Sequence, residues 1–363
     1  MKKFEKEIYQ AYLDNEDAVL KQLEAIYSQA LKDIDEKIKV FMSRPDADMQ
    51  HVIYQVEYQK ALRKQIAGIL DNLQAGEFET ISEYLVKSYE EGFLSSIYSL
   101  QKQGIPLCFP IDQEAVVKAV QLDSKISNGL YAGVGEDVAA LKKSIAAEVS
   151  RGISIGSSYA QIARQIRSHM VGAYTKKTGG ALYRAGMIAR TEGHRIQVQG
   201  TMDACYKAKD KGADVVKQWS AHLDARTRDS HWAIHHQTRE LDEPFSNGLM
   251  FPGDPSGRPE EVINCRCGLN QRARWALGRD ETQMLGDVSQ MDEKTKQRTA
   301  EMLNIPLDEL EEYSKSIVPI NAKNYEDFKE KYSKIWHYKG SDLEKEAEAR
   351  IAKHKAERNK PKG

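Results

Sequence analysis

A stripe of apolar residues near the N-terminus constrains the fold of this chain more than any other feature. Its members recur at steps of three or four: Leu20, Leu23, Tyr27, Leu31, Ile34, Ile38 and Phe41. A repeat of about 3.5 residues is typical of a long helix that packs along a partner helix in coiled-coil fashion. We expect this helix to end at Arg44-Pro45, because proline lacks a backbone donor and disfavours a helical residue before it.

Further stretches with helical periodicity follow the first one. Apolar stripes over 51–73 and 81–100 predict two more long helices, which we expect to end at Gly76 and Gly104. Buried stripes of this kind are how most helices gain stability, so they indicate a helical bundle. Shorter helices are expected over 113–120 with Asp112 as N-cap, over 136–149 after a turn at Asn128-Gly129, after Ser158, and over 181–211.

The pattern changes after Gly212. Residues 215–221 alternate and are rich in β-formers, which predicts a strand, and 262–269 could form a closing strand. Turn-forming residues crowd the segment between these strands. The sequence therefore predicts a mainly α protein with a long helical N-terminal body, a small α+β domain near residues 213–275, and a helical, partly disordered C-terminal tail. The expected segments are 1–107 with long helices, 108–179 with basic helices, 180–275 with a helix and the α+β domain, and 276–363 as a charged tail.

Composition excludes several classes of protein. The chain has 363 residues, enough for two or three domains, and a net charge of −1, so it is not a polycation overall. It has no apolar run of about 18 residues and no apolar core behind its first lysines, so we expect neither a membrane partner nor a secretory signal. With only 4 cysteines, two of them in a Cys-x-Cys pair, we expect synthesis in a reducing cytoplasm.

One stretch of the chain is strongly basic. Between Lys142 and Arg195 there are ten basic residues and only two acidic ones. Such an excess can hold the phosphates of double-stranded DNA without reading its sequence, and the candidate contacts are Lys176, Lys177 and Arg184. The alternative is a solvated face that meets an acidic neighbouring subunit. Aromatic residues do not alternate with the basic ones, which argues against single-stranded nucleic acid.

Residues that could bind a metal lie between Trp219 and Cys267. His231 and His235 are four apart and would share a helix face, whereas Cys265 and Cys267 are two apart and would share a strand face. An imidazole and two thiolates from His231, Cys265 and Cys267 could bind a structural zinc ion, with His235 as a fourth ligand. The alternative is a buried cluster without metal beside a hydrogen-bonded corner of Asp224, Arg226 and Arg228, in which the carboxylate caps the next helix.

The same residues allow an enzymatic alternative. A metal-dependent nuclease could use the cluster of His231, Cys265 and Cys267 together with His235, His236 and Asn264. A general base paired with a carboxylate is not evident in the sequence, however. The chain has neither a Gly-x-x-x-x-Gly-Lys-Ser/Thr loop nor a Gly-x-Ser-x-Gly elbow, so we expect no small-molecule substrate.

An ordered set of motifs resembles the phage head morphogenesis family, the Mu-F-like minor head proteins. The set comprises Ala189-Arg190-Thr191-Glu192, Trp219, Asp224-x-Arg226-Thr227-Arg228-x-x-His231, Phe245, Pro252-Gly253-Asp254-Pro255 and Asn264-Cys265-Arg266-Cys267. Its structural motif residues are Asp224, Arg226, Arg228, Asn264 and Arg266. Many relatives have two further ligand-type residues where this chain has Arg228 and Val262, so only His231, Cys265 and Cys267 remain at matching positions.

The resemblance implies a function without catalysis. Proteins of this family are low-copy components of a phage or prophage head, built in near the portal, and they contribute to assembly, packaging or DNA delivery. The expected partners are the portal and other head proteins, with double-stranded DNA as a further one. The expected location is the bacterial host cytoplasm during assembly and then the virion head. A coiled-coil interaction protein unrelated to capsids is the remaining alternative, but it would not need the ordered motifs.

Overall fold

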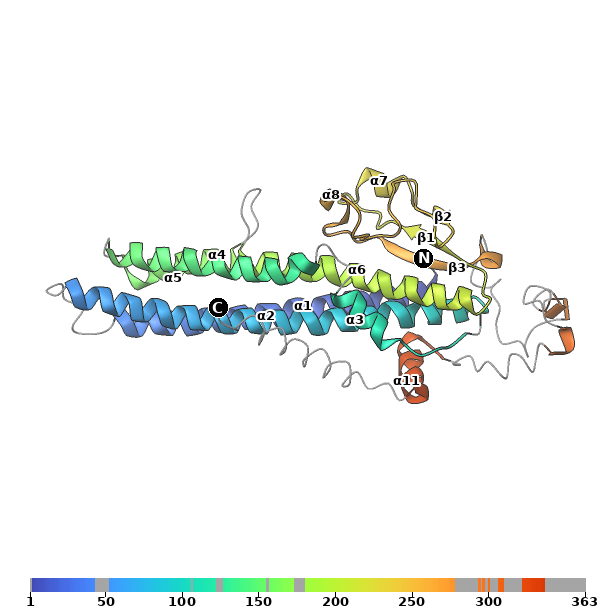
Figure 1. Cartoon of the computed structure of the whole chain (residues 1–363), viewed down its shortest axis with the longest axis horizontal. Helices are drawn as coiled ribbons and strands as arrows, with labels where there is room; N and C mark the ends of the chain where they lie inside the picture. Colours follow the sequence, from blue (N-terminus) through green and yellow to red (C-terminus); the bar gives the residue numbers. More distant parts are fainter. Residues whose placement is uncertain are drawn as a thin grey trace, which may run out of the picture. The chain divides into compact units, whose positions relative to one another are not determined.

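The computed structural model describes residues 2–42, 52–105, 107–121, 127–154, 157–172, 180–277, 293–294, 296–297, 300, 306–309 and 322–336. The mainly α prediction is confirmed (Figure 1). The long helices are α1 (Lys3–Met42), α2 (Val52–Lys102), α4 (Ser127–Ser154) and α6 (Ala181–Asp210). Shorter elements are α3 (Gln113–Gln121), α5 (Tyr159–Val171), β1 (Val215–Ser220), α7 (Asp229–Trp232), β2 (Thr238–Arg239), α8 (Pro259–Val262), β3 (Gly268–Ala273), η2 (Arg274–Ala276), η5 (Leu307–Glu309) and α11 (Tyr325–Trp336). No helix of these described ranges is long and apolar enough to cross a bilayer.

Two helix starts that the sequence predicts are confirmed by their N-terminal caps. Asp112 Oδ1 accepts hydrogen bonds from the backbone N–H of Glu114 at 3.0 Å and of Ala115 at 3.4 Å, so the predicted N-cap of α3 is confirmed. Ser158 forms a capping box with Gln161 at the start of α5, where the backbone N–H of Ser158 donates to Gln161 Oε1 at 2.8 Å. These contacts satisfy backbone donors that have no partner within the helix.

Two glycine-based predictions are wrong. Gly76 does not end a helix but lies inside α2, and Asn128-Gly129 is not a turn but belongs to α4. A glycine weakens a helix by only about 1 kcal/mol and keeps its backbone donor, so flanking contacts can override it. Next to Gly76 that support comes from buried Leu73 and Ile81 and from Ile26 of α1, whose Cδ1 would lie 3.8 Å from an added Cβ.

The chain forms two compact units, each assembled from separate stretches of sequence. The first contains Met1–Asn15, Leu85–Ser124 and Thr191–Gly363, and the second contains Glu16–Tyr84 and Lys125–Arg190. The division into four consecutive segments made from the sequence remains a prediction.

In the second unit, the predicted apolar seam of α1 packs on α2. Leu23, Tyr27, Ile34 and Ile38 are buried, whereas Leu20 and Phe41 are only half-buried. The Tyr27 hydroxyl donates to Glu77 Oε2 of α2 at 3.2 Å. Burial of this carboxyl raises its pKa to about 8. The coiled-coil pattern therefore also contains a buried polar contact.

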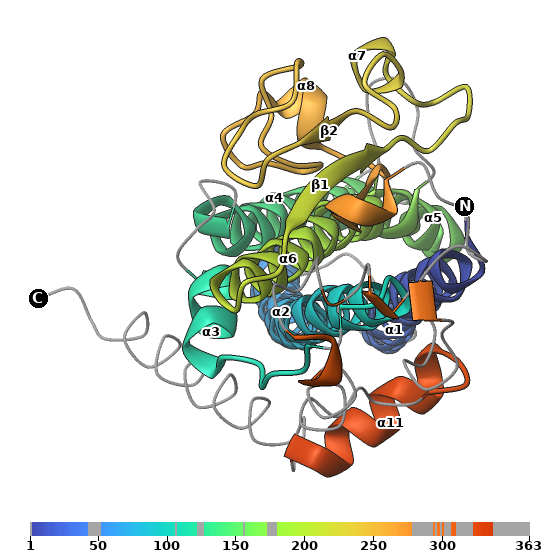
Figure 2. The same cartoon turned by 90° about the vertical axis from the view of Figure 1, so that its right-hand side faces the viewer.

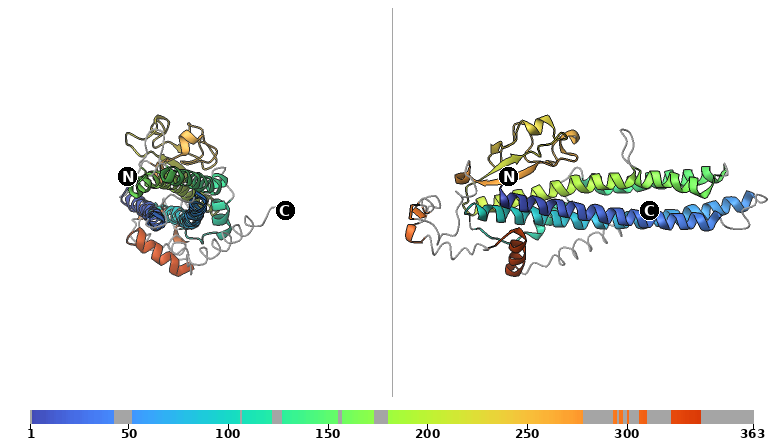
Figure 3. Two further views of the ribbon diagram at one scale, coloured as in Figure 1. Left: turned by 90° about the vertical axis from the view of Figure 1, so that its left-hand side faces the viewer. Right: turned by 180° about the vertical axis from the view of Figure 1, so that it is seen from behind.

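In the first unit, a three-stranded antiparallel sheet in the order β2-β1-β3 lies over helix α6 (Figure 2). Strand β1 pairs with β3 over its whole length, with Val216 opposite Arg272. Gln103, just after α2, binds the backbone of β3. Its Nε2 donates to Gln271 O at 3.0 Å, and its Oε1 accepts from Ala273 N at 3.1 Å. Helix α11 lies on the opposite side of the helical layer (Figure 3), where the Tyr325 hydroxyl donates to buried Glu91 of α2 at 2.8 Å.

A closing strand was predicted over 262–269, and strand β3 does pair with β1, but it begins only at Gly268, so the predicted start is wrong. Val262 instead ends the short helix α8, which begins at Pro259. Asn264 then has a φ of 53°, a left-handed conformation that interrupts an extended strand. The strand therefore starts after the Cys-x-Cys pair and not before it.

Helices α2 and α6 touch backbone to backbone at two glycines of the first unit. A Cβ added to Gly92 would lie 1.8 Å from Gln197 O, and one added to Gly200 would lie 2.3 Å from Tyr89 O. Contacts this short leave no room for a methyl group. The close approach also lets Thr201 Oγ1 donate to Gly92 O at 3.1 Å.

We expect Gly200→Ala to lower the free energy of unfolding by about 1–3 kcal/mol, because the added methyl must push the two backbones apart. Gly68→Ala is the matched control in α2, since its Cβ would meet nothing within 4 Å. That control should be neutral or stabilising by about 0.5–1 kcal/mol. Thermal unfolding followed by circular dichroism measures both, and equal melting temperatures for the two variants would contradict the close contact.

Candidate functional site

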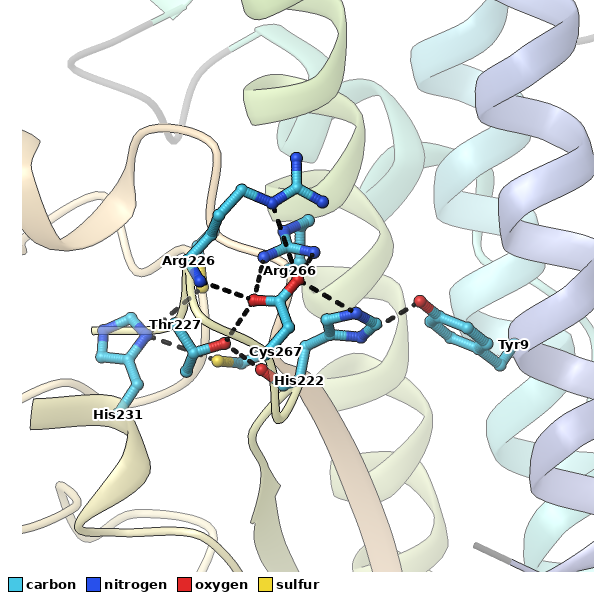
Figure 4. Close-up of polar contacts among 9 residues, drawn as sticks. Tyr9, His222, Arg226, Thr227, His231, Arg266 and Cys267 are labelled. Carbon is cyan, nitrogen blue, oxygen red and sulfur yellow. Dashed lines mark hydrogen bonds and ion pairs between the residues drawn. The ribbon is translucent and has the colours of Figure 1, made fainter. Parts of the chain in front are cut away.

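The three predicted metal ligands lie together beside the sheet. His231 is in α7, and Cys265 and Cys267 lie between α8 and β3. His231 Nδ1 is 3.7 Å from Cys265 Sγ and 3.4 Å from Cys267 Sγ. The ligand atoms of this group all lie within 4.8 Å of one another. Figure 4 shows Cys267 and His231 side by side. Because His231 is only 1 % exposed, Cys265 4 % and Cys267 2 %, the group is closed to solvent.

The backbone around Asn264 brings both cysteines to the cluster. Its positive φ turns the chain after α8, and its N–H donates to Thr191 Oγ1 of α6 at 3.1 Å. The next residue, Cys265, donates its N–H to Val262 O at 3.1 Å. The Cys267 carbonyl accepts a hydrogen bond from His194 Nε2 of α6 at 2.7 Å. Helix α6 and the turn therefore hold the pair from both sides, which gives Asn264 a structural role.

Glu261 lies on the other side of the His231 ring. His231 Nε2 is 2.9 Å from Glu261 Oε2, and Ser230 Oγ donates to the same carboxylate oxygen at 2.9 Å. The edge of the buried Trp219 ring packs on the imidazole, with 5.0 Å between the ring centroids. These contacts orient Nδ1 toward the sulfurs. Sequence analysis missed Glu261, because the acidic pair at 260–261 gives no spacing signal that selects one of its members.

The two thiols have unlike acidities. Hydrogen bonds from Cys265 and from His231 to the Cys267 sulfur lower the pKa of the Cys267 thiol. The same contact between the thiols, together with burial, raises the pKa of the Cys265 thiol. One negative charge shared between two sulfurs is thus favoured over two, as expected for neighbouring acids in a buried place.

The donor set fits a zinc ion by its chemistry. Thiolate sulfur and imidazole nitrogen are the donors that structural zinc sites use, and all three are close together and shielded from water. His235 is not part of this group among the described residues. Helix α7 ends at Trp232, so the expected helical face shared with His231 does not form. The His235 Nδ1 instead accepts a hydrogen bond from Ala221 N at 3.0 Å.

Asp224 forms the predicted corner, but with a further partner. Its carboxylate accepts two hydrogen bonds from Arg266, at 2.7 and 2.8 Å (Figure 4). The backbone N–H of Arg226 donates to Asp224 at 2.9 Å, and its side chain, 78 % exposed, forms a longer ion pair with the same carboxylate at 3.6 Å. Arg228 points elsewhere and donates to the carbonyls of Glu260 and, at 2.6 Å, of Ile263. The predicted pairing with Arg226 is therefore present, whereas the pairing with Arg228 and the helix-capping role are wrong, since Arg228 binds two carbonyls and the N-cap of α7 is Arg228 itself.

The corner and the cluster join the same two segments. Arg266 lies between the two cysteines in sequence and contacts Asp224, while the cysteines contact His231. His222 extends the link to α1, because its Nδ1 is 3.2 Å from the Tyr9 hydroxyl. Together these contacts fasten the loop before α7 to the chain entering β3.

The predicted DNA contacts are only partly described. Lys176 and Lys177 lie outside the described residues. Arg184 Nε donates to Asp137 at 2.7 Å, so its charge is neutralised within the second unit. Other basic residues of the stretch are also paired: Lys142 with Asp71, Arg151 with Glu148, Arg190 with Glu16, and Arg195 with Glu192. Carboxylates therefore neutralise the charges of these basic residues in the folded chain, which leaves fewer of them free to bind phosphates.

The corner gives a prediction about acid stability. The hydrogen bonds from Arg266 hold the pKa of Asp224 well below its ordinary value. Its contribution to stability is therefore present above the unfolded-state pKa of about 3.9 and is lost as the pH falls toward the folded-state value. Asp224→Asn should lower the melting temperature at pH 7, and the gap to the wild type should narrow below about pH 4. A gap that stays constant with pH, or one also seen for exposed Asp210→Asn, would refute this role.

The chain is similar to known proteins over most of its length. Residues 143–270 match the family model described as phage Mu protein F like protein. The Minor head protein GP7 of Bacillus phage SPP1 is 27 % identical over 267 residues, 71 % of this chain and 83 % of that protein. The NAD(+)--arginine ADP-ribosyltransferase EFV of Enterococcus faecalis is 28 % identical over 274 residues, 74 % of this chain and 54 % of that protein.

The extent of these matches differs between the two relatives. The chain spans about half the length of the Enterococcus relative but most of the phage protein. No solved structure is significantly similar to the chain. The family match includes the corner, His231, Cys265 and Cys267, which are the motifs that resemble the Mu-F-like proteins. The resemblance is therefore confirmed: residues 143–270 match the phage Mu protein F like family, and the chain is similar to a minor head protein.

Proposed function

We propose that this chain is a minor head protein of a tailed phage or prophage and acts in head morphogenesis through contacts, without catalysis. The observation that carries this proposal is the similarity to Minor head protein GP7 over 83 % of that protein. The Mu-F-like region at residues 143–270 supports the same function. The expected locations are the host cytoplasm during assembly and the virion head afterwards.

The name of the Enterococcus relative, an ADP-ribosyltransferase, points to a different class of protein. Because this chain covers only 54 % of that relative, the enzymatic activity of the whole protein does not transfer with the match. The match covers 83 % of the phage protein, so the name of that protein accounts better for the shared region.

Nothing in the comparisons supports the nuclease alternative. Its candidate residues His231, Cys265 and Cys267 are almost fully buried, so a DNA phosphate would not reach them without a rearrangement. A buried cluster that joins two segments favours a structural role over a catalytic one.

The portal and other head proteins are the proposed partners. A helical protein of this kind would bind them through side chains of its long helices, as helices do in bundles. This part of the proposal rests on the head-protein similarity alone.

Quantitative mass spectrometry of particles purified after induction of the source strain tests the proposal. We expect the protein in particles at a few copies per head, far below the major capsid protein, and cross-linked to the portal after chemical cross-linking. Abundance in the lysate together with absence from particles would overturn the head-protein proposal. Presence in particles without portal cross-links would overturn only the portal contact.

DNA contact is proposed at the packed pair of helices α4 and α5. Lys143, Arg164 and Arg167 are exposed there and form no ion pair with another described residue. The two helices pack on each other through buried side chains such as Ile162, which lies against Gly152. Three exposed cations on adjoining helices can contact phosphates without reading bases.

Replacing Lys143, Arg164 and Arg167 by Gln should weaken binding to duplex DNA equally for unrelated sequences. Each lost phosphate contact lowers the slope of log affinity against log salt by about 0.9, so the loss should be about 2–3 in total. Lys32, Lys37 and Lys39, exposed on α1, provide a control variant with the same change in charge. Equal slopes for the two triple variants would exclude this face as the DNA contact.

A further inference from the structure

We propose that His231, Cys265 and Cys267 bind one zinc ion, and that Glu261 is a positioning residue that holds the His231 ring for it. This inference does not rest on the proposed function, since it depends only on the geometry of the cluster. Binding would require both sulfurs as thiolates, so the proton that the pair of thiols still shares would be released to solvent.

The first support is the donor set. Two sulfurs and one imidazole nitrogen from distant parts of the sequence converge within 4.8 Å, and each residue is at least nine-tenths buried. The Nδ1 of His231 faces only two sulfur atoms, which are weak hydrogen-bond partners. A cation bound by all three atoms would compensate for the burial of this nitrogen.

The second support is the carboxylate on the far side of the ring. Glu261 Oε2 lies 2.9 Å from His231 Nε2 and is held by the Ser230 hydroxyl. Metal-binding histidines commonly place a carboxylate on the nitrogen that does not bind the metal, which fixes the tautomer and ring orientation. A small tightening of this contact on binding would place the proton on Nε2 and leave the Nδ1 lone pair for zinc.

The third support comes from Arg228, whose side chain fixes the turn that leads to the two cysteines. Its guanidinium binds the carbonyls of Glu260 and Ile263, so it fastens the α8 turn by hydrogen bonds. The described residues thus offer three ligands, and the fourth position is left to a water molecule. A three-ligand site predicts weaker binding than the closed four-ligand sites of zinc fingers.

Metal content of the purified full chain tests the site directly. Prepared without chelators, the protein should contain about one zinc per chain. The double variant Cys265→Ser, Cys267→Ser should contain none, whereas Cys108→Ser, a change outside the cluster, should keep it. If the double variant fails to fold, cobalt titration of the wild type decides, since thiolate binding gives a charge-transfer absorption band. Absence of both zinc and that band would overturn the proposal, as would rapid alkylation of Cys267 in the presence of zinc.

The affinity of the chain for zinc, and not its zinc content, tests the role of Glu261. Glu261→Gln should weaken zinc binding by about 10–100-fold in competition with a chromogenic chelator, with the cobalt band retained. Glu260→Gln is the matched control, because the neighbouring side chain is 61 % exposed and lies away from the ring. Equal zinc affinities for the two variants would overturn the positioning role of Glu261 and leave the ligand assignment intact.

Discussion

The arrangement of the small sheet depends on the bidentate ion pair between Asp224 and Arg266. Arg266 lies between Cys265 and Cys267, so its contact with Asp224 determines that both thiols face the other way, toward His231. The ion pair is only partly shielded from water, with its side chains about 30 % exposed. Partly exposed ion pairs contribute little to the free energy of folding by themselves. The main effect of this pair is therefore to fix the direction in which the neighbouring side chains point.

Helices α2 and α6, which pack against the sheet, restrict its position. Gly92 and Gly200 bring α2 and α6 into backbone contact, and Gln103 carries the register of β3 through two hydrogen bonds to its backbone. A side-chain amide that donates to one strand residue and accepts from another fits only one register. The helical layer therefore positions the strand whose start carries the cysteines, which links the helix packing to the cluster.

Local patterns in the sequence were enough to predict the elements whose signals are local. The apolar seam of α1, the Asp112 cap and the alternation of β1 each follow from residues within a few positions of one another. The continuity of α2 through Gly76 depends on Ile26, and the partner of Asp224 is distant Arg266. Such contacts are tertiary, so propensity and spacing could not select them. Of the site, the three metal-type residues could be predicted from residue type, whereas Glu261 could not.

The motif residues of the Mu-F-like region all take part in structure. Asn264 supplies a left-handed turn, Arg228 binds two carbonyls, and Thr191 accepts from the turn backbone. An active site would be expected to direct polar groups into an open cleft, but here they are used within the chain. Motifs that specify one folded arrangement remain useful to a protein whose task is to present a fixed surface to its neighbours. Asn264, Arg228 and Thr191 therefore act together to hold the small sheet and the turn before it in one arrangement.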